Sequence, residues 1–281
     1  MGLGVSVVRS SRSWLAIVSF QLWPISANLP HMVTAPALTV TPTLTSLWPI
    51  AVIAAMLAFV ALAEVARPDR AAQRRRWPVN FALGLVNAVL VRLASVAAPA
   101  GVAEVAATFD YGLLRQVDLP LPAVIIIAII AMDFAIYWQH RLFHATRWGW
   151  ALHRLHHADG AMDVSTAVRF NPAEALVSML YKSALTLFLG LPLVAVLAFE
   201  AWLAVGSIIE HANLRLPARA DAVLRRVWVT PAMHRVHHSA HGDDHNHNYG
   251  FALSLWDHLF GTHRADASGE QIGLPLGRAA G

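Results

Sequence analysis

Long apolar segments separated by short polar ones dominate this chain. The segment 47–66 carries Glu64 as its one charged residue and has the roughly 20 residues that a helix needs to cross a bilayer. Segments 81–103 and 121–138 predict two further spanning helices, and 175–209 predicts a helical hairpin that turns near its GLP sequence. The pattern therefore predicts an all-α fold, an integral-membrane helical bundle of about four to six membrane helices.

The polar segments predict how this bundle is oriented. Segment 67–78 joins the first two predicted helices and contains five arginines. Loops rich in Lys and Arg lie on the cytoplasmic side of membrane proteins, so this loop is predicted to be cytoplasmic. An even number of crossings then brings the chain back to the same side after 138 and again after 209. The sequence therefore predicts a multi-pass protein in which the polar segments after 138 and after 209 lie in the cytoplasm.

Composition agrees with a membrane protein and excludes other classes. The chain is 57% hydrophobic and 14% charged, with a mean hydropathy of +0.50. Its net charge of +4 comes from scattered basic residues with no nucleic-acid-binding motif, so membrane lipid is the expected acidic neighbour and nucleic acid is not. Because there is no cysteine, a metal in this chain must be held by nitrogen and oxygen ligands.

We expect three parts along the chain. Residues 1–45 form an N-terminal extension, either disordered or signal-like. Residues 46–264 form one membrane domain whose motif-bearing core is 120–263. Residues 265–281 form a loose C-terminal tail without chemistry.

Histidines supply the candidate chemistry. Two windows, 140–157 and 234–250, hold eleven of the fifteen histidines. Within them, residues three or four apart share one helical face, which is a metal-chelating arrangement. His211 follows an apolar segment at the same predicted depth and is a ninth candidate. Imidazole suits Zn, Cu, Fe and Ni, and these side chains suffice for two metal ions: His140, His144, His153, His156, His157, His211, His234, His237 and His238.

Other polar residues are weaker candidates. His245 and His247 lie in a polar, glycine-containing run that equally resembles a solvated loop. Asp133 lies inside a predicted span, where ionisable residues are often functional, and could orient a histidine by accepting its second N–H. We expect His258 and His263 to be ordinary polar residues.

The three histidine boxes and their flanks resemble one known family. The sequences HRLFH, HRLHH, EHANLRL, VTPAMHRVHHS and NYGFALSLWDHLFGTH are similar to those of the fatty acid hydroxylase / sterol desaturase superfamily of integral-membrane di-iron enzymes. The resemblance implies that the nine histidines above form a cytoplasmic cap that holds two iron ions. It further implies an O2-dependent hydroxylase or desaturase that acts on a C–H bond of a membrane lipid, such as a sterol, fatty acyl or carotenoid. A ferredoxin or cytochrome-type protein would supply the electrons.

The chain departs from the family pattern at two positions. Many members read RFHPxE where this chain reads RFNPAE, so Asn171 replaces a histidine while Glu174 is kept. Asn246 stands where many members have an acidic residue. We expect Asn171 to supply a carbonyl ligand or a supporting hydrogen bond, with His245 or His247 completing the ligand count.

Two other functional classes remain open at this point. One is a membrane protein whose histidine cap holds zinc without turnover. The other is a metal transporter, although transport sites are expected near the bilayer midplane and not at the ends of the spans.

Overall fold

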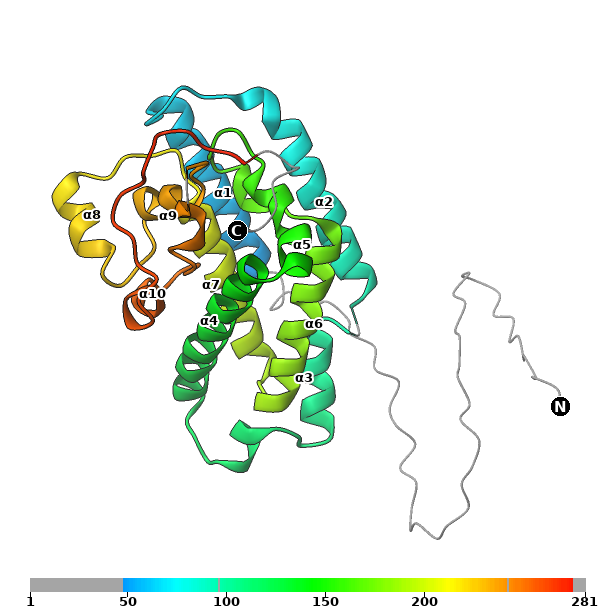
Figure 1. The fold of residues 1–281 in the computed structure, drawn as a ribbon. Coiled ribbons are helices and arrows are strands. Elements are labelled where there is room, and N and C mark those ends of the chain that lie inside the picture. The colour runs from blue at the N-terminus through cyan, green and yellow to red at the C-terminus, as the bar shows by residue number, and fades with distance from the viewer. Residues whose placement is uncertain (1–47, 96, 242, 275–281) are drawn as a thin grey trace, which may run out of the picture. The chain divides into compact units, whose positions relative to one another are not determined.

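The computed structural model describes residues 48–95, 97–241 and 243–274 (Figure 1). Within these ranges the chain is helical, and β-pairing is limited to two isolated bridges. Four 3-10 turns, at Arg74–Arg76, Leu113–Gln116, Thr166–Val168 and Asp244–Asn246, connect the α-helices. The α-helices are α1 (Trp48–Ala66), α2 (Trp77–Leu93), α3 (Pro99–Thr108), α4 (Leu121–Ala145), α5 (Arg147–His157), α6 (Pro172–Leu189), α7 (Leu193–Glu210), α8 (Ala218–Leu224), α9 (Pro231–His237) and α10 (Leu255–Leu259).

Three of the described helices, α1, α4 and α7, are long and apolar enough to cross a membrane. They match the expected spans at 47–66 and 121–138 and the second arm of the hairpin. The helices α1 and α4 both pack on α7, and a core that includes Met132, Ile136, Val196 and Phe199 joins α4 to α7. The all-α bundle is confirmed, while a total of four to six membrane helices stays a prediction.

The α6–α7 hairpin forms where the sequence predicts it. Asn171 caps α6 by accepting a hydrogen bond from the Ala173 amide at 2.9 Å, and a proline follows at the first helical position. The helix ends at Gly190, whose φ of 69° is a left-handed conformation that glycine adopts without strain. Pro192 then precedes α7. The GLP turn is therefore a helix stop followed by a helix start.

The predicted span 81–103 is wrong as one continuous helix. The helix α2 ends at Leu93, and α3 begins separately at Pro99 after Ala98 in extended conformation. Proline lacks the amide that would continue a helix and disfavours helical geometry at the preceding residue. Both α2 and α3 pack against α6, so the break lets the two pieces follow the hairpin.

The arginine loop lies at the histidine-bearing end of the bundle. Arg76 forms ion pairs with Asp159 and Asp163, which follow the second histidine box. The Asp69 amide donates to the Asn213 carbonyl at 2.9 Å, just after His211. The loop and the histidines therefore lie on the same side, as the count of crossings predicts.

The structure describes part of the C-terminal segment but not the N-terminal extension. The prediction for residues 1–45 concerns a part of the chain outside the described residues. The expected loose tail is instead packed on the histidine cap as far as residue 274: Leu274 is buried, and its amide donates to the His157 carbonyl at 2.8 Å. Backbone hydrogen bonds and the buried Leu274 side chain thus hold a segment that was predicted from its composition to be loose.

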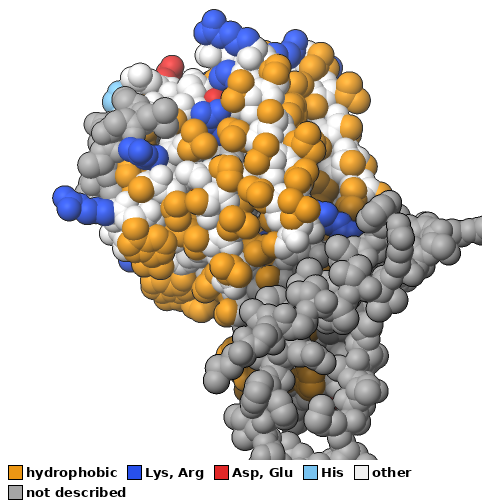
Figure 2. Space-filling model, turned by 90° about the vertical axis from the view of Figure 1, so that its right-hand side faces the viewer, with side chains coloured by type: hydrophobic (Ala, Val, Ile, Leu, Met, Phe, Trp, Pro, Cys, Tyr) orange, Lys and Arg blue, Asp and Glu red, His pale blue; other side chains and the backbone are white. Residues whose placement is uncertain are grey.

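Exposed apolar side chains continue from the spanning helices onto α8 and α10. Hydrophobic side chains cover most of the helical face shown in Figure 2. On another part of the surface, the Phe260 ring lies 5.2 Å from the ring of Trp138, which places α10 beside the histidine end of the apolar run in α4. We call the following exposed residues the α8–α10 patch: Val223, Leu224, Val227, Leu255 and Leu259.

We predict that the α8–α10 patch lies in the lipid interface. Because the chain has no cysteine, Leu259→Cys and Val223→Cys can each carry one environment-sensitive dye. In phospholipid vesicles both dyes should be quenched by brominated acyl chains and protected from iodide, since amphipathic segments bury their apolar face about 5 to 10 Å into the interface. Ala267→Cys, on the exposed surface of the cap, is the control and should show the opposite. Iodide quenching at Leu259 as strong as at Ala267 would contradict the placement.

Candidate metal centre

Four short segments bring the histidines together. His140 and His144 occupy the last turns of α4, and α5 begins immediately afterwards because Thr146 caps it by accepting a hydrogen bond from the Gly149 amide at 3.2 Å. The histidines of the second box lie on the buried face of α5. Those of the third box lie on α9 and at its end, and His211 directly follows α7. All nine are buried, although they come from segments far apart in sequence.

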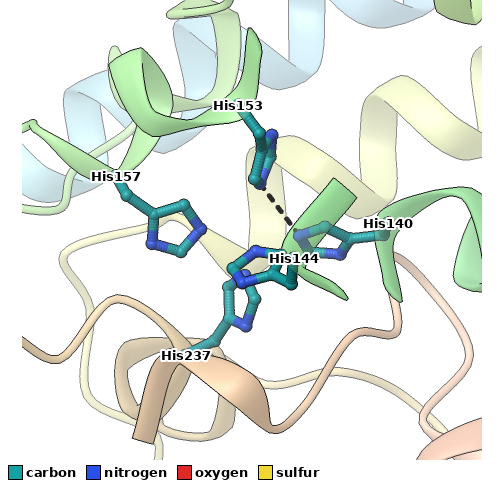
Figure 3. A group of neighbouring side chains, drawn as sticks. All are labelled: His140, His144, His153, His157 and His237. Carbon is teal, nitrogen blue, oxygen red and sulfur yellow. Dashed lines mark hydrogen bonds between the residues drawn. The ribbon is translucent and has the colours of Figure 1, made fainter. Parts of the chain in front are cut away.

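The first cluster, which we call the five-histidine group, is drawn in Figure 3. Its side chains come from α4, α5 and α9, and the rings point toward a common centre. Each ring offers a nitrogen, and these nitrogens all lie within 4.8 Å of one another. The members are His140, His144, His153, His157 and His237.

The second cluster, the four-histidine group, adjoins the first. It meets the same 4.8 Å limit and consists of His156, His211, His234 and His238. The His157 ring of the first group stacks on His238 of the second, with ring centroids 4.5 Å apart. The structure thus divides the nine predicted ligands into two neighbouring groups, and neither group includes His245 or His247.

The separations between ring nitrogens suit shared metal ions. The Nε2 atoms of His140 and His153 are 3.0 Å apart, and Nε2 of His211 lies 3.1 Å from Nε2 of both His156 and His234. Two nitrogens about 2.1 Å from one ion lie roughly 3.0 to 3.4 Å apart for bond angles between about 90° and 109°. The observed spacings fall in that range.

Unpartnered ring nitrogens are a second sign of a metal. His144, His157 and His238 are buried, and neither ring nitrogen of any of them has a hydrogen-bond partner in the described structure. A buried polar atom without a partner costs about 1 to 3 kcal/mol. A bound metal ion would remove that cost for one nitrogen of each ring, because an imidazole lone pair is a good ligand. The donor set therefore fits metal ions.

The outer nitrogens of five rings are fixed by hydrogen bonds. A ligating histidine usually donates its other N–H to a carbonyl or carboxylate, which sets the tautomer and the ring orientation. In this chain Nδ1 takes that role, at distances of 2.7 to 3.1 Å. The acceptors are the Tyr249 carbonyl for His140, Glu174 Oε1 for His153, the Arg169 carbonyl for His156, the Ser207 carbonyl for His211 and the His247 carbonyl for His237.

Asp257 fixes the backbone turn that carries the Tyr249 carbonyl, the acceptor for His140. Its carboxylate accepts hydrogen bonds from the Tyr249 amide at 2.8 Å and the Gly250 amide at 2.9 Å. A Cβ at Gly250 would lie 2.6 Å from the Leu253 carbonyl oxygen, so this turn requires glycine. The NYG and WD motifs thus position the carbonyl that orients His140.

Histidines in both groups have lowered pKa values, which favours metal binding. Burial, and then the neighbouring imidazoles, hold the pKa of His156, His157, His234, His237 and His238 well below the usual value of 6.5. Burial likewise lowers the pKa of His211 to about 4. These rings are therefore neutral at pH 7, which is the form that binds metal.

The remaining sequence candidates occupy other roles. The Asn171 side-chain oxygen caps α6, and Asp133 accepts hydrogen bonds from the indoles of Trp202 and Trp256 and from no histidine. The His245 ring lies 6.2 Å from the His144 ring, centroid to centroid. His247 contributes its backbone carbonyl to His237, while its own Nδ1 contacts the Asp243 carbonyl. Glu174, a further candidate as a ligand or a supporting residue, contacts the box histidine His153 through its side chain.

Glu210 is a site residue that the sequence analysis missed. It is fully buried, and its two carboxylate oxygens lie 3.5 Å from Nδ1 of His211 and of His234, respectively. Its position directly before His211, at the end of an apolar helix, was the available signal. A charged residue there is costly unless it has a partner.

An apolar cavity of about 520 Å³ adjoins the five-histidine group. We call it the lipid-sized cavity, because small-molecule sites span about 300 to 1,000 Å³. It lies between α2, α3, α4, α6 and α7, and His140, His153 and Glu174 line its histidine end. Most other lining residues are apolar, including Ile136, Phe143, Met179, Val196, Leu203 and Phe251.

Comparison with known proteins covers the same region. Residues 125–262, close to half of the chain, match the family model for fatty acid hydroxylase. Human alkylglycerol monooxygenase is 31% identical over 152 residues, which is 52% of this chain and 32% of that protein. Ornithine lipid hydroxylase OlsE of Rhizobium tropici is 31% identical over 143 residues, or 51% of this chain and 42% of that protein.

A third relative and the extent of these matches complete the comparison. Fatty acid hydroxylase vlmA of a Lecanicillium species is 28% identical over 145 residues, or 47% of this chain and 40% of that protein. The chain thus spans less than half of the length of these relatives, and no solved structure matches it. The matched region contains all nine grouped histidines, and on this evidence residues 125–262 belong to the fatty acid hydroxylase family.

Proposed function

We propose that this protein is an O2-dependent hydroxylase or desaturase that acts on a C–H bond of a membrane lipid with the help of two iron ions. The observation that carries the proposal is the contact between the histidines and the lipid-sized cavity: His140 and His153 belong to the five-histidine group and also line the cavity. A lipid bound in the cavity would therefore reach the metal centre directly.

The two groups would each hold one iron ion. The five-histidine group and the four-histidine group contain enough neutral nitrogens for two ions. An ion that is not fully coordinated by protein ligands keeps coordination positions open for a small molecule. Iron held in this way would supply the activation of O2 and the removal of hydrogen from an unactivated C–H bond. The resemblance to di-iron enzymes, not the geometry, supplies the identity of the metal.

The protein's own residues orient the ligands and exclude water. The Nδ1 hydrogen bonds fix the rings, and Phe170 stacks on His156 with centroids 4.5 Å apart and planes 9° from parallel. The apolar lining around Phe143 and Phe251 keeps the lipid chain away from water. A dry, preorganised site protects a strong oxidant from side reactions.

We further propose that the histidine end faces the cytoplasm. The support is its contact with the arginine loop, where Arg67, Arg70, Arg74 and Arg75 are exposed. A ferredoxin or cytochrome-type protein would deliver electrons from that side.

The names of the relatives include an alkylglycerol, an ornithine lipid and a fatty acid. Each is a lipid, so we propose a lipid as the substrate of this chain as well. Sterol, carotenoid and fatty-acyl substrates all remain within the proposal. Comparing the lipids of cells with and without the gene would identify the substrate and the reaction, because hydroxylation adds about 16 mass units and desaturation removes about 2.

A cap that holds zinc without turnover is the main alternative, because the same neutral histidines bind zinc. A metal transporter is less well supported, because the grouped histidines lie at the ends of α4 and α7 and in the segments beyond them. Transport sites instead lie near the bilayer midplane.

We predict two metal ions per chain in protein prepared with iron. His144→Ala in the five-histidine group and His238→Ala in the four-histidine group should each lower the bound metal toward one, as measured by mass spectrometry of the metal. His263→Ala is the control and should keep two ions, because His263 stacks on His258 away from both groups. One ion per wild-type chain would refute the two-site assignment.

We predict that Glu174→Ala weakens metal binding by roughly 10 to 100-fold, which is the usual effect of removing the outer partner of a ligating histidine. The matched control is Asn171→Ser, which lies on the same turn of α6 and keeps a capping hydroxyl. Titration with iron in the absence of oxygen gives both affinities. Equal affinities for Glu174→Ala and wild type would mean that the contact with His153 does not support a metal.

We predict that product forms only with O2, iron and an electron donor, and that a hydroxyl product carries oxygen from labelled O2. His237→Ala and His156→Ala should abolish product while the protein still inserts in the membrane, because insertion depends on the apolar helices. Lipid mass spectrometry under ¹⁸O2 measures the result. Undiminished turnover in either variant would refute the proposal, and tightly bound zinc without oxygen consumption would favour the zinc alternative.

A further inference from the structure

An ion pair lines the lipid-sized cavity at a distance from the histidines. Lys182 of α6 places Nζ 2.7 Å from both carboxylate oxygens of Glu200 in α7. Both side chains belong to the cavity wall and keep 14% and 33% of their surface accessible. The pair thus combines two charged groups with an otherwise mainly apolar space.

The pair lies deep along the bundle. Lys182 follows Glu174 by eight residues on α6, which is about 12 Å at 1.5 Å per residue. On the other arm, Glu200 precedes Trp202 by two residues, and the Trp202 indole donates to Asp133 in the apolar run of α4. Both routes place the pair near the middle of the predicted membrane layer, about 12 Å from the histidine end of the cavity.

Stability alone does not account for this pair. Removing two charges from water costs several kcal/mol per ion, and apolar replacements of similar volume are often neutral or stabilising. Ionisable residues inside membrane segments are rare and mark binding sites or pathways more often than packing. Both residues line the cavity, so a ligand there can reach the pair.

The chemistry of the pair selects a neutral hydrogen-bonding group. Lys182 has three N–H donors, of which two face the oxygens of Glu200, and the carboxylate retains free lone pairs. Because the two charges cancel, an added anion or cation would leave an unmatched charge in an apolar space. A hydroxyl can accept from the lysine and donate to the glutamate at the same time.

We propose that Lys182 and Glu200 bind the hydroxyl end of an amphiphilic alcohol whose apolar end reaches His140 and His153. This inference rests on the proposed function and adds the substrate class and its direction in the site. The reacting carbon lies about 12 Å from the hydroxyl, or about ten bonds along an extended alkyl chain built from C–C bonds of roughly 1.5 Å.

The direction follows from the cost of moving a polar end into the bilayer. An alcohol that kept its hydroxyl at the membrane surface would present only hydrocarbon to the depth of Lys182 and Glu200, and the pair would face no polar partner. An alcohol oxidised far from its hydroxyl must carry that group inward. A buried hydroxyl without a hydrogen bond is costly, and the pair removes that cost.

Two photoreactive long-chain alcohols test the direction. One carries a diazirine beside the hydroxyl, and the other carries it about ten carbons away. The full chain in phospholipid vesicles is irradiated with each, and the labelled peptides are mapped by mass spectrometry. The first probe should label α6 and α7 around Met179 and Leu203, and the second should label the region of Phe143 and Phe251.

Variants test the pair itself. Lys182→Met with Glu200→Met should lower labelling by the first probe about tenfold, the effect of losing about one to two hydrogen bonds. The exchange Lys182→Glu with Glu200→Lys keeps both charges and should restore labelling. Tyr181→Phe, on the same helix but bonded to the Ala135 carbonyl, should leave labelling unchanged. Retention of two metal ions shows that each variant is folded.

The outcomes separate this inference from the proposed function, because labelling needs neither iron nor oxygen. Expected labelling in a protein without turnover would support the alcohol site and refute the enzyme. Labelling with the two ends reversed would overturn the inference even in an active enzyme. Equal labelling of the double methionine variant and wild type, or no labelling of the cavity by either probe, would also overturn it.

Discussion

The burial of nine neutral imidazoles is the constraint on which the rest of this structure depends. Each ring has two nitrogens, and in a dry interior each nitrogen needs a partner. Hydrogen bonds satisfy one nitrogen on five of the rings, while His144, His157 and His238 have none. Metal ions at the two centres would each partner one nitrogen of every ring they bind, which would couple folding of the cap to metal binding.

This constraint explains why so much of the cap is ordered by backbone carbonyls. A carbonyl can orient a ring only if its own loop is fixed, and here Asp257 fixes the turn that carries the Tyr249 carbonyl. Of the two short helices here, α9 buries Met233 and Val236 beside its histidines, whereas α10 buries only Asp257. Their role is to hold chain segments at the positions that the rings require.

In the proposed function, the bundle below the cap would bring a lipid to the metal centre and keep water away from it. The hairpin of α6 and α7 supplies the wall of the lipid-sized cavity, and Glu174 at the start of α6 contacts His153. One helix therefore links ligand orientation at the cap to the Lys182–Glu200 pair in the bundle. The cavity thus has histidines at one end and an ion pair at the other, and the proposed direction of the substrate rests on that difference.

Local spacing along the chain was enough to predict several parts of this protein. Apolar runs of sufficient length predicted α1, α4 and α7, the GLP turn predicted the hairpin, and the box spacings predicted the histidines. The tertiary structure decided how those histidines divide into groups of five and four, because that depends on how α4, α5, α7 and α9 cross. It also assigned Asn171 to a helix cap and Asp133 to two tryptophans. A side chain's partner across the fold leaves no periodic signal in the chain, so the Glu210 contact with His234 and the Lys182–Glu200 pair emerged only when distant segments were brought into contact.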